Sequence, residues 1–272
     1  MMDTLYAIMD ALLPFEWLSY TFMKNALLAM LLITPLFGLL GTMAVDNRMA
    51  FFSDALGHSA LTGIAIGVVL GWQNQMAAML IFGILWAVRI TFVKHNSKMS
   101  ADTIISVFSS TSIALGLVVL SRGGAFAKYS SVLVGDVLSI TQVDLAALAL
   151  IAWLALFNPL MITSINSPLA RSRGIRSRLT EYGFTILVAV AVMVSIRWVG
   201  VMLINSLLIL PAAASRNVAR NAAGYMRLSV LISMLCGVCG LVLSYYLDTS
   251  AGAAVVLLCA AVYFATLPLR RK

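Results

Sequence analysis

The chain has 272 residues, of which 62% are apolar and only 10% are charged, and its formal net charge is +8. A soluble globular domain usually contains about 25% charged residues, so this composition, with a mean hydropathy of +1.01, excludes a water-soluble fold. The positive charge does not indicate a nucleic-acid partner, because the basic residues form short clusters between apolar segments and not one continuous patch.

Long apolar stretches follow one another along the whole chain, and their length suits helices that cross a hydrocarbon core about 30 Å thick. They lack the alternation of apolar and polar residues that marks the strands of a membrane β-barrel. We therefore predict an all-α membrane protein, a polytopic helical bundle that forms one transmembrane domain over residues 1–272. About nine spans are expected, near residues 21–45, 50–71, 75–93, 103–120, 144–162, 180–196, 198–211, 227–246 and 252–268.

Residues 1–19 precede the first span and contain acidic but no basic residues, so a signal peptide is not indicated. We expect this segment to lie in the membrane interface, with Trp17 and Tyr20 at the level of the headgroups. Between residues 180 and 211 we expect two helices that divide near Arg197, because an unpaired arginine at mid-membrane is costly. Residues 121–143 form the longest connection, and their pattern leaves a re-entrant and a surface helix equally open.

The orientation follows from the distribution of lysine and arginine between alternate loops. One side holds 14 of the 18 basic residues: Arg48, Arg89, Lys94, Lys98, Arg171, Arg173, Arg176, Arg178, Arg216, Arg220, Arg227, Arg270, Arg271 and Lys272. Basic residues accumulate on the cytoplasmic side of a membrane protein. The sequence therefore predicts a multi-pass protein of the cytoplasmic membrane, with its N-terminus outside and its C-terminus in the cytoplasm.

The second span carries a carboxylate and an imidazole, Asp54 and His58, four residues apart in an otherwise apolar helix. At about 100° per residue the two side chains share one face, with roughly 6 Å of rise between them. Zinc and manganese both accept these ligand types, and ionisable groups inside a membrane are candidates for function. The alternative is an ion pair that only joins helices. Two groups are also too few for a complete metal site, so water or another helix is needed.

Other polar residues in the spans are weaker candidates. Thr62 is expected on the same face as Asp54, whereas Gly63, Gly67 and Gly71 are expected to pack against a neighbouring helix. Asn205 and Ser206 either line a pathway or join helices, and the sequence favours neither. The Cys236–Cys239 pair is expected to consist of small packing residues, and His95 is expected to be a solvated loop residue.

The segment 212–227 is short, alanine-rich and basic, with Arg216 and Arg220 spaced by about one helical turn. It fits a small amphipathic helix that docks a cytoplasmic motor, and the alternative is an ordinary basic loop. The chain has no Gly-Lys dipeptide and hence no loop of the Walker A type for ATP phosphates. The energy source of a pump would then lie in another polypeptide.

Three stretches resemble the permeases of zinc and manganese ABC importers: residues 48–58, which carry Asp54 and His58, residues 199–214 around Pro211, and residues 243–252. Gly135-Asp136 resembles a Gly-Asp of that family in the same relative place. The chain departs from the family pattern at Gly57, where a serine is usual, and at Thr249, Ser250 and Ala253, where prolines are common.

The resemblance implies a fold like that of type II ABC importers and a permease that dimerises, with a homodimer expected. It also implies a cytoplasmic ATP-binding cassette ATPase as partner and an extracytoplasmic metal-binding protein that delivers the ion. By the same resemblance, Asp54 and His58 correspond to intramembrane metal and gating residues, and 212–227 to the coupling helix. No permanently bound cofactor is expected, only transported Zn²⁺ or Mn²⁺. The residues after His58 favour zinc slightly, again by resemblance.

Two other functions remain open from the sequence alone. A proton-coupled secondary metal transporter would also place Asp54 and His58 in the membrane. An intramembrane metalloenzyme is disfavoured, because the chain has no HExxH motif and only two histidines.

Overall fold

Eight apolar helical segments, each long enough to cross a membrane, make up the part of the chain described by the computed structural model, which covers residues 6, 9–10, 15–122 and 177–269. The helices are α2 (Thr21–Asp46), α3 (Phe52–Val69), α4 (Gln75–Asn96), α5 (Ala101–Arg122), α11 (Ser177–Val218), α12 (Ala222–Tyr246) and α13 (Ala251–Thr266). Short 3₁₀ turns at Glu16–Ser19 and Leu267–Leu269 flank them.

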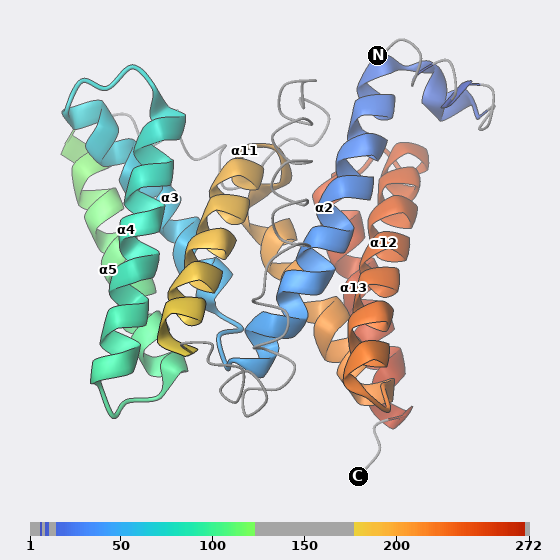
Figure 1. Ribbon diagram of the computed structural model, residues 1–272. Helices are drawn as coiled ribbons and strands as arrows, with labels where there is room; N and C mark the ends of the chain where they lie inside the picture. Colours follow the sequence, from blue (N-terminus) through green and yellow to red (C-terminus); the bar gives the residue numbers. More distant parts are fainter. Residues whose placement is uncertain (1–5, 7–8, 11–14, 123–176, 270–272) are drawn as a thin grey trace.

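The long helix α11 contains two membrane spans, Arg178–Ile196 and Trp198–Val218. The kink between the two halves of α11 lies at Gly200, in the first turn of the second span, where φ is 76° and ψ is 160°. Only glycine adopts such a conformation without steric cost. Figure 1 shows the first half of α11 rising in the bundle and the second half descending. The expected division of this region into two helices is therefore confirmed, with the break three residues beyond Arg197.

Each of these eight segments corresponds to one of the nine spans expected from the sequence. The remaining expected span, 144–162, lies outside the described residues, as do Gly135-Asp136 and most of the 121–143 connection. The all-helical membrane bundle is confirmed. The sequence located these helices correctly because the thickness of the hydrocarbon core fixes the length of an apolar segment.

Helix α11 joins two groups of helices. It contacts α3 and α4 on one side and α2, α12 and α13 on the other, as Figure 1 shows. Small and hydroxyl residues allow these helices to approach closely. Ser229 and Ser233 of α12 donate hydrogen bonds to backbone carbonyls of α2, those of Gly38 at 2.6 Å and Thr34 at 2.7 Å.

The glycines of α3 pack as the sequence predicts. A Cβ built at Gly63 or Gly67 would lie within about 3 Å of α4, against Phe82 or Ala78. Gly71 differs, because it ends the helix with a φ of 71°. The Trp72 N–H then bonds the Gly67 carbonyl at 2.8 Å, which is the Schellman arrangement.

Two expectations about the chain's shorter segments need revision. The segment 212–227 does not form a separate small helix: its first residues complete α11, and its last residues begin α12 after the short connection 219–221. The three residues that remain between α11 and α12 are too few to form a helix of their own. Trp17 does not face the headgroups but is buried in the core with Leu18, whereas Tyr20 is exposed.

Candidate functional site

Asp54 and His58 lie in the first and second turns of α3, a helix that begins near the lower end of the bundle in Figure 1. The Asp54 Oδ2 and His58 Nε2 atoms are 3.5 Å apart, and the two side chains are 39% and 27% exposed. The sequence therefore placed both groups correctly on one face. That face of α3 is therefore partly exposed and is not sealed in the core.

The separation of the two side chains suits one shared metal ion. Zinc–oxygen and zinc–nitrogen bonds are about 2.0–2.1 Å, so two atoms 3.5 Å apart subtend roughly 115–120° at such an ion, close to a tetrahedral angle. Among the described residues, no group of three or more His, Cys, Asp or Glu side chains could hold a metal. Within that part of the chain the pair can therefore supply two ligands and leave the other positions open.

Asn205, in the second half of α11, completes the arrangement. Its Nδ2 donates a hydrogen bond of 2.8 Å to Asp54 Oδ1, which leaves Asp54 Oδ2 directed toward His58. The two helices approach closely here, because a Cβ at Gly57 would lie 2.5 Å from Val201 Cγ1. Gly57, which stands where the family usually has a serine, therefore forms part of this contact between α3 and α11.

The other expected pathway residues do not join the pair. Thr62 is fully buried, and its hydroxyl donates a hydrogen bond of 2.5 Å to the Ser112 carbonyl of α5, so its place in a pathway stays a prediction. The helix turns it toward α5. Ser206 lies beside Asn205 on α11, but its hydroxyl bonds the Met202 carbonyl of its own helix at 2.9 Å.

The two arginines of the expected coupling segment have different surroundings. Arg216 lies in the last turn of α11 and donates a hydrogen bond of 3.2 Å to Asp46, at the end of α2. Arg220 lies in the connection between α11 and α12, so the two residues are not on one helical face. Both are exposed at the same end of the bundle.

A second polar cluster at this end was not predicted. Lys94 Nζ contacts Glu181 at 2.7 Å and donates to the Asn47 carbonyl at 3.3 Å. His95 lies 3.3 Å from Glu181 and is only 19% exposed, so the expectation of a solvated histidine was wrong. One signal could have revealed the cluster: Glu181 is an isolated acid between basic segments.

The cysteines do not form a two-thiol site on α12. Cys236 is buried and Cys239 is exposed, so their side chains lie on different faces of the helix. This agrees with the packing role expected of them.

Comparison with known proteins finds a match to one protein family over nearly the whole length of this chain. The model of the ABC 3 transport family matches residues 19–270. This chain belongs to that family. The membership expected from residues 48–58 and 199–214 is thereby confirmed.

Three relatives of this ABC 3 permease illustrate the likeness. The manganese import system permease protein ScaB of Streptococcus parasanguinis is 29% identical, over 90% of this chain and 89% of the relative. The high-affinity zinc uptake system membrane protein ZnuB of Haemophilus influenzae is 31% identical, over 88% and 94%. The structure of PsaBC from Streptococcus pneumoniae in complex with Fab has a TM-score of 0.74 and 26% identity, covering 98% of this chain and 95% of the other.

Proposed function

We propose that this chain is the membrane permease subunit of an ATP-driven importer of a divalent transition metal, zinc or manganese, and that the ion passes the Asp54–His58 pair. The single observation that carries this proposal is the 3.5 Å separation of a carboxylate oxygen and an imidazole nitrogen on a membrane-spanning helix. The names of ScaB and ZnuB, a manganese and a zinc system, support the substrate class.

A site of few ligands suits transport. Conduction requires binding that is favourable enough for entry and weak enough for release. Asp54 and His58 would supply a carboxylate oxygen and an imidazole nitrogen, and the Asn205 amide holds the carboxylate in place. Zinc is the first cation to test, because the residues after His58 resemble zinc permeases slightly more than manganese permeases.

The remaining ligands would come from a second copy of the chain. Asp54 and His58 are partly exposed on α3, and Met202 is 78% exposed on the second half of α11. A homodimer that joins these faces would bring a second Asp–His pair to the ion. It would also enclose a route between the two copies.

The ATPase would dock at the lower end of the bundle, which is cytoplasmic in the proposed orientation. Arg216 and Arg220 are exposed there, and Arg216 reaches Asp46. Asp46 ends α2, and the turn 47–51 that follows leads directly into the helix of Asp54. A movement of Arg216 would therefore be transmitted to the metal site through a short piece of backbone, which Lys94 holds from the other side.

The opposite end of the bundle, which carries the N-terminal segment, would receive the ion from an extracytoplasmic metal-binding protein. The chain would span the bacterial cytoplasmic membrane with its C-terminus inside.

The test is uptake of zinc and of manganese by vesicles that contain this chain and its ATPase. We expect Asp54→Ala and His58→Ala to abolish uptake while membrane insertion and thermal stability persist. Normal uptake by both variants would refute the site. Uptake that stops with the proton gradient, and not with ATP depletion, would favour the proton-coupled secondary transporter instead.

A further inference from the structure

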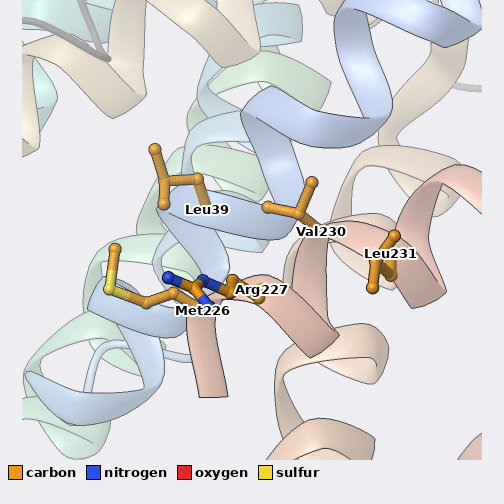
Figure 2. A pocket seen from close by; sticks show the side chains of 5 residues that line it. All are labelled: Leu39, Met226, Arg227, Val230 and Leu231. Atoms are coloured by element: carbon orange, nitrogen blue, oxygen red, sulfur yellow. The ribbon is translucent and has the colours of Figure 1, made fainter. Parts of the chain in front are cut away.

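An apolar groove with a single cation lies on the lower part of the bundle, away from the Asp54 site. Its volume is about 410 Å³, and its lining residues are Leu39 of α2 and Met226, Arg227, Val230 and Leu231 of α12. Figure 2 shows the four apolar side chains around Arg227. The groove opens outward, since Leu231 is 55% exposed.

The groove adjoins a close backbone contact between α2 and α12. A Cβ at Gly38 would lie 3.0 Å from the Ser229 carbonyl oxygen and from Val230 Cα. The adjacent hydrogen bond from Ser229 to the Gly38 carbonyl holds the two backbones together. The backbones on the two sides of the groove are therefore held together at Gly38 and Ser229.

Arg227 has no acidic partner among the described residues, and its side chain is exposed. It lies in the second turn of α12, near the N-terminal end of this helix of membrane-spanning length. A guanidinium group at this depth faces the phosphate region of a bilayer, and cationic pockets between membrane helices bind anionic headgroups.

We infer that this groove binds one anionic phospholipid, whose acyl chain packs against Leu39, Val230 and Leu231 while its phosphate contacts Arg227. The apolar walls match the hydrocarbon chain, and the unpaired charge matches the headgroup. A dimer partner would have to supply an acidic residue for Arg227, whereas a membrane supplies phosphate throughout. This assignment does not depend on which ion the protein transports.

The experiment is native mass spectrometry of the delipidated full-length chain, titrated with dioleoylphosphatidylglycerol or dioleoylphosphatidylcholine. A single cation near the membrane surface favours an anionic lipid by about fivefold in affinity. We expect this preference in the native chain and its loss in Arg227→Gln. The matched control is Arg89→Gln, which removes an exposed arginine from α4, far from the groove, and should leave the preference intact.

A second variant tests whether the apolar walls of the groove bind the acyl chain. Leu231→Trp should fill the groove and weaken the binding of both lipids, with circular dichroism confirming that the helices persist. The inference is overturned if Arg227→Gln keeps the full preference for phosphatidylglycerol. It is equally overturned if Leu231→Cys, in a Cys239→Ser background, crosslinks to a second copy of the chain, because protein would then occupy the groove.

Discussion

The Asn205 amide donates a hydrogen bond of 2.8 Å to the Asp54 carboxylate, although the two residues are 151 positions apart. Groups that orient a metal ligand typically change metal affinity by about 10- to 100-fold when they are removed. We therefore expect Asn205→Ala to raise the metal concentration for half-maximal uptake by about that factor. Uptake titrations with zinc and with manganese measure it.

Ser206→Ala is the matched control for Asn205→Ala. Ser206 is the next residue on the same helix, but its hydroxyl bonds the Met202 carbonyl of that helix and not Asp54. Its removal should leave the metal dependence unchanged. Equal effects of the two substitutions would show that Asn205 acts through general helix packing and not through Asp54.

The contact between Arg216 and Asp46 gives a prediction about coupling. Both side chains are largely exposed, 60% and 37%, and such pairs contribute only about 0–1 kcal/mol to stability. Asp46→Asn should therefore leave the thermal midpoint nearly unchanged while lowering the number of ions imported per ATP hydrolysed. Transport and hydrolysis measured in the same vesicles give this ratio.

Charge reversal tests whether coupling depends on the contact between Arg216 and Asp46 or only on the charges of the two residues. Arg216→Glu with Arg220→Glu should uncouple hydrolysis from transport. The exchange of Asp46→Arg with Arg216→Asp should restore part of the coupling, because the pair is re-formed in reverse. A ratio that stays at the native value in Asp46→Asn would mean that the turn 47–51 does not transmit movement.

The sequence predicted what depends on local periodicity. Hydropathy located the described spans, and the spacing of four residues placed Asp54 and His58 on one face. It did not identify Ser112 of α5 as the partner of Thr62, because helical periodicity gives the direction of a side chain but not the identity of the neighbouring helix. The contacts of Asn205 with Asp54 and of Lys94 with Glu181 join distant parts of the chain. No pattern within one helix contains that information.

The cluster around Lys94 is expected to stabilise the fold. Lys94 and Glu181 are about one-fifth exposed and 2.7 Å apart. Lys94→Met leaves the Glu181 carboxylate without its nearest cation and the Asn47 carbonyl without a donor. After allowance for partial solvent screening, we expect a loss of about 1–2 kcal/mol. Thermal unfolding in detergent measures it.

Lys98→Met is the control for that variant, because it removes an exposed lysine that follows the same helix. Its thermal midpoint should stay within error of the native value. Similar losses in both variants would assign the effect to net charge and not to the contact with Glu181.

The closest approach of α2 to α11 predicts a severe packing defect. A Cβ at Gly41 would lie 1.8 Å from the carbonyl oxygen of Leu208, which is backbone and cannot rotate away. Overpacking of this kind costs about 1–3 kcal/mol or more, so Gly41→Ala should lower both the thermal midpoint and the yield of folded protein. Gly252→Ala is the matched control, since its Cβ would meet no atom nearer than 3.5 Å. If Gly41→Ala is as stable as Gly252→Ala, α2 and α11 must lie further apart at Gly41 than described.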